Sequence, residues 1–168
     1  MDGLREACDD YVTETIRTHK YEALQSGPGL DISAMLQDPY LQALPAYLAA
    51  VVTDDSSAVT RLVDEMVQDA ADYFTDGVRS GMLRPADEPD DRAALLVIWS
   101  LGALVLHRHV ARHLGVDLTD PSATRTPAFA RLMRATTALY SDGLFTEPFA
   151  AAMNDALSSL STPREESA

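Results

Sequence analysis

Three histidines close together in the sequence are the side chains best placed for metal chemistry. His109 and His113 are four residues apart, so on a helix both rings lie on one side and could hold one ion, with His107 nearby. No Asp, Glu or Cys stands at matching helical spacing beside them. The alternative is that these histidines, with Arg108 and Arg112, form the polar end of a helix and favour its negative C-terminal dipole. We therefore predict no metal site and no cofactor.

The sequence also lacks the combinations of residues that enzymes use for catalysis. Cys8 is the only cysteine and lies on the apolar stripe of its predicted helix, which favours a buried thiol over a nucleophile or a redox sensor. The sequence contains no Glu-x-x-His motif of a di-iron bundle, no Gly-x-Ser-x-Gly elbow, no phosphate-binding loop and no dinucleotide fingerprint. An enzyme is the least favoured class, and we predict a chain without catalytic residues.

The charge balance argues against direct binding of nucleic acid by this chain. With 26 acidic against 13 basic residues the formal net charge is -13, and the basic residues are scattered, so this chain alone is not expected to grip a phosphate backbone. The lone cysteine allows no internal disulfide, and no charged leader with an apolar signal core precedes the first predicted helix. We expect a cytoplasmic protein with no membrane partner.

The pattern of apolar residues predicts helices throughout. Helical spacing recurs between turn signals, and no segment alternates apolar and polar residues as half-buried strands do. We predict one all-α domain over residues 1–160 and a polar tail over 161–168. The expected helices are about 2–24, a short one from 32, 39–52 with a kink or split at Pro45, 57–83, an apolar helix from Pro89 to Gly115, 126–144 and a short one at 149–160. Gly77 and Gly81 lie on the apolar stripe of the 57–83 helix and suggest close approach of a neighbouring helix.

The apolar helix is the most informative of these elements. Between Ala93 and Leu106 nearly every residue is apolar, so large side chains point in all directions and the helix must be covered on every side. It is too short to span a bilayer, which needs about 20 apolar residues. Because a chain of this size has few helices with which to wrap it, one side is expected to meet a second copy. This predicts a helical homodimer.

Three motifs stand in a fixed order along the chain. Tyr73-Phe-Thr-Asp-Gly-Val-Arg-Ser-Gly-Met-Leu-Arg-Pro85 ends one predicted helix, Asp91-Arg-Ala-Ala-Leu-Leu96 opens the next, and Ala138-Leu-Tyr-Ser-Asp-Gly-Leu-Phe-Thr146 closes the last long one. With the predicted helices, these motifs resemble the C-terminal, effector-binding and dimerisation domain of the tetracycline-repressor (TetR) family of transcription regulators. The first is similar to the family's Gly-Leu-Leu-Arg-Pro-like turn, and the third to the close of the family's last dimer helix. The order and spacing of the three motifs, rather than any one of them, indicate the family.

The resemblance implies that the last two long helices of each subunit form an intermolecular four-helix bundle. On the apolar helix we assign to the partner the side that turns polar at its end, as an interface rim would, and we assign the side that carries Trp99 to the pocket or core. The predicted interface residues are Val97, Leu101, Leu104, Val105 and Arg108 on this helix, with Leu132 and Leu139 on the last long helix.

The resemblance also implies that the earlier helices enclose a mostly apolar effector pocket. Residues that line such a cavity combine aromatic or flexible apolar surface with a few polar tips. The residues that fit this description are Tyr11, His19, Tyr47, Met66, Tyr73, Trp99 and His107. For each of them, ordinary core packing or a partly exposed aromatic ring is the alternative interpretation.

The family's DNA-binding headpiece is expected to be missing from this chain. Signatures similar to Thr-Thr, Ala-Gly-Val-Ser and Tyr-Tyr-His-Phe do not occur, and residues 1–24 resemble the helix that follows the headpiece. A shortened piece of the protein, a start codon assigned too late and a true loss all remain open. We predict the ligand-sensing, dimer-forming half of a regulator that meets DNA only through the missing helix-turn-helix. The alternatives are a free-standing helical dimer that binds a small molecule or a partner protein, and an enzyme.

Overall fold

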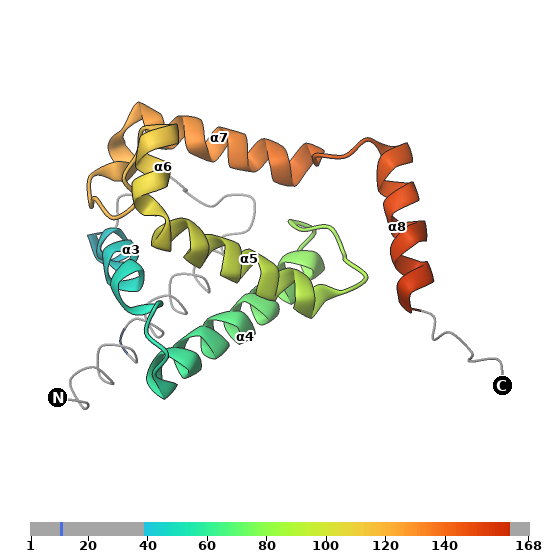
Figure 1. The fold of residues 1–168 in the computed structure, drawn as a ribbon, viewed down its shortest axis with the longest axis horizontal. Coiled ribbons are helices and arrows are strands. Elements are labelled where there is room, and N and C mark those ends of the chain that lie inside the picture. The colour runs from blue at the N-terminus through green and yellow to red at the C-terminus, as the bar shows by residue number, and fades with distance from the viewer. Residues whose placement is uncertain (1–10, 12–38, 162–168) are drawn as a thin grey trace. The chain divides into compact units, whose positions relative to one another are not determined.

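The computed structural model describes Tyr11 and residues 39–161, and every regular element in this part of the chain is a helix. These are α3 (Pro39–Val51), α4 (Ser57–Arg79), α5 (Pro89–Val105), α6 (His107–Leu114), a short 3₁₀-helix (Ala123–Arg125), α7 (Pro127–Asp142) and α8 (Glu147–Ser161) (Figure 1). The all-α class is confirmed for the described residues. The helices expected over 2–24 and from 32 lie outside them. The chain divides into two units, Met1–Phe129 and Ala130–Ala168, and each is described by itself.

α4 begins where the sequence predicts. The N-cap is Ser56, whose hydroxyl accepts a hydrogen bond from the backbone N–H of Val59 at 3.4 Å. The Asp54 carboxylate in turn accepts from the N–H of Ser56 at 3.1 Å. These acceptors satisfy backbone donors that have no partner inside the helix, which is why Ser and Asp cluster before helices.

α4 ends at Arg79, before the predicted end at Leu83. Gly77 and Gly81, which were expected to allow close approach of a neighbouring helix, instead lie at the turn that ends α4. Gly81 has φ +78°, and its N–H and that of Met82 donate to the carbonyls of Val78 and Gly77, which closes the helix in a Schellman turn. Gly77 is buried, and a Cβ atom there would lie 2.7 Å from Leu83 Cδ1. The closest neighbour of the Gly77 position is therefore Leu83 in this turn and not a second helix.

The turn after α4 is tied to the start of α5 by Arg92. Its guanidinium Nη1 donates to the carbonyl of Arg84 at 2.7 Å, and the guanidinium carbon lies 5.5 Å from the centroid of the Phe74 ring. A cation over an aromatic face is attracted by the ring's electrons. Arg92 thus joins the end of α4, the loop and α5 in one contact.

α5 is the central helix of the first unit and packs against both α3 and α4 (Figure 1). The core holds six buried residues from these three helices, with Ala93 completely buried; they are Leu48, Leu62, Ala70, Ala93, Val97 and Leu101. α3 continues through Pro45 without splitting. A helix tolerates the one hydrogen bond that proline removes when packing holds it, and Leu44 and Tyr47 on either side of Pro45 pack against this core.

The long apolar helix predicted up to Gly115 is instead two helices. α5 stops at Val105, and α6 starts at His107 after a bend of 79°. Leu106 has φ −91° and ψ 18°, and its carbonyl accepts from the N–H groups of both His109 and Val110. No glycine or proline marks the break, so the sequence pattern does not reveal it. The end at Gly115, in the left-handed region with φ 74°, is as predicted.

No described helix is by itself long and apolar enough to cross a membrane; α5 and α6 meet those criteria only together, as the bent pair.

α7 begins beside Thr126, whose hydroxyl accepts from the N–H of Phe129 at 3.2 Å, as the predicted Thr-Pro start requires. It ends at Asp142 before Gly143, which has φ 75°. α8 follows at Glu147–Ser161, close to the predicted 149–160.

Candidate functional site

Within the described part of the first unit, the largest group of exposed apolar side chains lies on α5. Leu95, Ile98 and Trp99 on this helix and Val105 and Leu106 at its end are all between 42% and 61% exposed, and Trp99 is the most exposed of them. Their spacing of three, four and seven residues places them on one side of the helix. We call these five residues the α5 face. Large apolar residues gathered on one surface mark a binding site more often than residues scattered singly do.

The opposite side of α5 forms the chain's own core, which corrects the sides assigned from the sequence. Val97 and Leu101, assigned to a partner, are 9% and 8% exposed and pack with Leu62 and Ala70. Leu104 is half-buried against the same cluster. Buried side chains offer no surface to a second chain, whereas Val105 and Arg108 remain exposed.

The residues proposed for a pocket differ in their burial. Tyr47 and Met66 are half-buried and pack against the core cluster. Tyr73 is half-buried beside Phe74, with ring centroids 5.8 Å apart. Of the others, Tyr11 and Trp99 are exposed, His107 is half-buried, and His19 lies outside the described residues.

α7 also carries an apolar face. Leu132 is half-buried, and Met133, Leu139 and Tyr140 on the same side of the helix are exposed. Two of these, Leu132 and Leu139, are the interface residues predicted for the last long helix.

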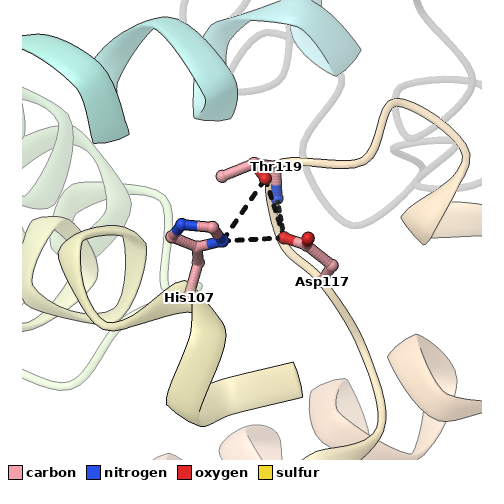
Figure 2. A network of polar contacts seen from close by, with 3 residues as sticks. All are labelled: His107, Asp117 and Thr119. Carbon is pink, nitrogen blue, oxygen red and sulfur yellow. Dashed lines mark hydrogen bonds and ion pairs between the residues drawn. The ribbon is translucent and has the colours of Figure 1, made fainter. Parts of the chain in front are cut away.

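A polar network at the start of α6 joins the two ends of that short helix. His107 is its first residue, and its ring Nδ1 lies 3.0 Å from Oδ1 of Asp117, in the loop beyond its last turn (Figure 2). The same Oδ1 accepts from the Thr119 N–H at 3.0 Å and from the Thr119 hydroxyl at 2.7 Å. These bonds hold the loop that follows α6 against the first residue of that helix.

The network keeps Asp117 ionised. Hydrogen bonds from the backbone N–H of Thr119, then from its hydroxyl, and then from His107 lower the pKa of the Asp117 carboxyl below its usual value. All three donors favour the charged form of their acceptor.

We expect the substitution Asp117→Asn to weaken folding and to change its response to acid. A carboxyl group with a lowered pKa stabilises the folded state above its unfolded-state pKa, and that contribution disappears as the pH falls through the folded-state value. The wild-type chain should therefore lose stability from about pH 4 downward, and the variant should lose less over that range. At neutral pH the variant should lose about 1 kcal/mol of its free energy of unfolding. The loss is small because the Asp117 side chain is 47% exposed, so water screens its interactions.

Urea unfolding measured between neutral pH and acid tests this expectation. Asp87→Asn, in the exposed loop before α5, is the matched control for removing one negative charge. The expectation would be contradicted if the free energy of unfolding fell with decreasing pH in the same way in the wild type and in Asp117→Asn.

Arg112 lies between the rings of the two neighbouring histidines. Arg112 Nη2 lies 3.1 Å from His109 Nδ1 and 3.0 Å from His113 Nε2, so a cation already occupies the position between the two rings. Across Tyr11 and residues 39–161, no three His, Cys, Asp or Glu side chains come together in a way that could hold a metal ion.

Asp117, Thr119 and Arg92 are the residues that sequence reasoning missed. An Asp two residues before a Thr, followed by Asp120-Pro121, is a typical turn pattern, and it was available as a signal. Nothing in the sequence indicated that this turn would meet His107. The contact of Arg92 with Phe74 joins residues 18 positions apart, and no local pattern marks it.

Comparison with known proteins defines the class of this chain. Residues 39–146 match the family "Tetracyclin repressor-like, C-terminal domain", and the chain belongs to this family. The match extends from the first residue of α3 to the residue before α8. This is a family of transcription regulators and not of enzymes.

A curated relative gives a more specific likeness. Over 107 residues the chain is 35% identical to the HTH-type transcriptional regulatory protein RaaS of Mycobacterium tuberculosis (strain ATCC 25618 / H37Rv). The matched segment covers 63% of this chain and 50% of the relative, so the chain spans about half the length of that protein.

Proposed function

We propose that this chain is the effector-sensing and dimer-forming part of a TetR-family transcription regulator. The observation that carries the proposal is the α5 face: five large apolar side chains lie exposed on a helix of a family whose C-terminal domains typically dimerise. Their contact with water is unfavourable by about 25 cal/mol for each Å² of apolar surface. Association with a second copy would remove that cost.

The dimer that we propose uses the α5 face and the apolar face of α7 in an intermolecular four-helix bundle. Gly102 supports close approach at α5, because it lies in the helix among the residues of this face and, apart from its two neighbours and the backbone of its own helix, nothing described lies within 4 Å of the position of a Cβ atom there. A glycine inside a helix costs about 1 kcal/mol relative to alanine. A second helix packed against Gly102 would use the space that the missing side chain leaves.

In this proposal the effector is a small, mostly apolar molecule that binds among the earlier helices. Tyr47, Met66 and Tyr73 on α3 and α4 stay proposed contacts, with His107 as a polar one, whereas Trp99 is reassigned to the dimer face. An effector acts on such a dimer only through its different affinity for two arrangements of the subunits. In typical allosteric proteins that difference is about 1 to 3 kcal/mol.

DNA binding belongs to a helix-turn-helix domain outside the matched region in this account. The relative's name describes it as an HTH-type regulator, and this chain spans half of its length. The formal charge of -13 agrees with a sensing role for these residues and opposes their direct contact with phosphates. The working compartment that we propose is the cytoplasm.

Native mass spectrometry of the purified chain tests the proposal. We expect a dimer that retains a small molecule from the expression host or gains one from a panel of apolar compounds. A chain that stays monomeric at every concentration and binds no compound of the panel would contradict it.

A further inference from the structure

We propose that the two α5 helices of the dimer run antiparallel, so that Trp99 of each copy packs into the space beside Gly102 of the other. This inference rests on the proposed function, which brings the α5 faces of two copies together. It adds the direction and the register of that contact, and it names the pair of residues that determines the fit.

The α5 face has its largest exposed side chain and an open position one turn apart. Trp99 is 61% exposed, and Gly102 follows three residues later on the same side of the helix. Side chains of a helix lean toward its N-terminus, so the indole ring leans away from Gly102 of its own chain. Apart from the two neighbours of Gly102 and the backbone of its own helix, nothing described lies within 4 Å of a Cβ atom placed there. Only a side chain from another molecule is left to use this space.

An antiparallel pair brings the tryptophan and the glycine of different copies together. In an antiparallel pair with two-fold symmetry, a residue before the midpoint of the contact faces a residue the same number of positions after it. The α5 face extends from Leu95 to Leu106, so its midpoint lies between residues 100 and 101. In this register Trp99 faces the partner's Gly102, and Leu95 faces the partner's Leu106. A parallel pair would instead place each residue opposite its own counterpart, with two indole rings competing for one place.

The charges at the two ends of the α5 face favour the same direction. The first turn of α5 contains Asp90 and Asp91, whereas α6, which follows its other end, contains Arg108 and Arg112 and no acidic residue. All four of these side chains are exposed. An antiparallel pair directs the acidic end of each α5 toward the basic end of the other. A parallel pair would bring like charges together, and these repel each other.

Disulfide trapping in the full chain tests the direction and the register. Leu95→Cys and Leu106→Cys are made in separate chains in which Ala replaces Cys8, so each chain has one thiol. The two chains carry tags of different length and are coexpressed and oxidised. We expect a covalent dimer that contains one chain of each kind and no covalent dimer from either variant alone, because only the unlike positions face each other. Ser100→Cys, on an exposed residue that points away from the α5 face, is the control in place of Leu95→Cys and should form no disulfide with Leu106→Cys.

The substitution Gly102→Leu tests the fit of the indole ring. The single chain has room for the new side chain, and leucine favours a helix more than glycine does, so the helix content should not fall. In the dimer the leucine would occupy the place of the partner's Trp99 at two symmetric positions. The Kd of the dimer, measured by sedimentation, should therefore rise about a hundredfold. Adding Trp99→Ala to this variant makes room for the leucine and should recover part of the affinity.

Covalent dimers from Leu95→Cys alone or from Leu106→Cys alone would show a parallel pair and overturn the inference. An unchanged Kd in Gly102→Leu would overturn it as well. Light scattering of the wild-type chain separates these failures from that of the proposed function. A wild-type dimer whose coexpressed variants form no mixed disulfide removes the antiparallel register alone, whereas a wild-type chain that stays monomeric removes the dimer and the register with it.

Discussion

The double substitution Ile98→Glu and Trp99→Glu is expected to give a folded monomer. Both side chains are more than half exposed in the single chain, so charges there do not disturb its core. In a dimer formed by the α5 face the same carboxylates would be buried next to their counterparts from the second chain. Unpaired buried charges cost several kcal/mol each, which is enough to remove the dimer at micromolar concentration. Light scattering gives the mass, and circular dichroism the helix content.

Ser100→Glu is the matched control for this prediction. Ser100 lies next to Trp99 and is exposed, but it points away from the α5 face, and its hydroxyl donates to the carbonyl of Leu96. This variant should keep the mass of the wild-type chain. A dimer that persists in the Ile98→Glu and Trp99→Glu variant would place the interface elsewhere.

Leu101→Glu should unfold the chain instead of dissociating it. Leu101 is 8% exposed in the core cluster with Leu62 and Ala70, and no cation from the described part of the chain belongs to that cluster. A carboxylate there is expected to cost at least about 3 kcal/mol. That is a large part of the total stability of a domain, about 5 to 15 kcal/mol. Thermal unfolding followed by circular dichroism measures the loss.

Leu101→Met, which conserves volume and polarity, is the control and should cost less than about 1.5 kcal/mol. A soluble, fully helical monomer from Leu101→Glu would return Leu101 to the interface and contradict its place in the core. The two predictions therefore test opposite sides of one helix with the same type of substitution.

Much of the architecture was predictable because local chemistry decides it. The start of α4 at the Asp54 to Ser56 cap, the end of α6 at Gly115 and the start of α7 after Thr126 all depend on residues next to the backbone groups that they satisfy. The apolar stripe of α4 was predictable for a related reason. Its acidic side is so different from its apolar side that only one orientation buries a core.

The orientation of α5 was not predictable in this way. A helix that is apolar on all sides has little periodicity, so the sequence does not distinguish the side that meets α3 and α4 from the side that stays exposed. Trp99 illustrates this, because a lone tryptophan is expected inside a pocket and is in fact 61% exposed. Tertiary packing, which depends on residues far along the chain, decides the orientation.

The site at His107 was predictable only in part. Its aromatic ring and polar edge identified it as a ligand-binding candidate, but its partners come from a loop ten and twelve residues further on. Their contact depends on the way the loop after Gly115 folds back along α6, and no local pattern indicates that path. The Gly-Met-Leu-Arg-Pro segment that indicated the family has a local explanation, since Gly81 allows the Schellman turn that ends α4.

The most direct test of a dimer formed through the α5 face is the fluorescence of Trp99 as the chain is diluted. Trp99 is the only tryptophan, so all tryptophan emission reports on this face. We expect blue-shifted emission at high concentration and a red shift on dilution, in step with a fall in sedimentation mass from dimer to monomer. Emission typical of a tryptophan in water while the mass remains that of a dimer would contradict it.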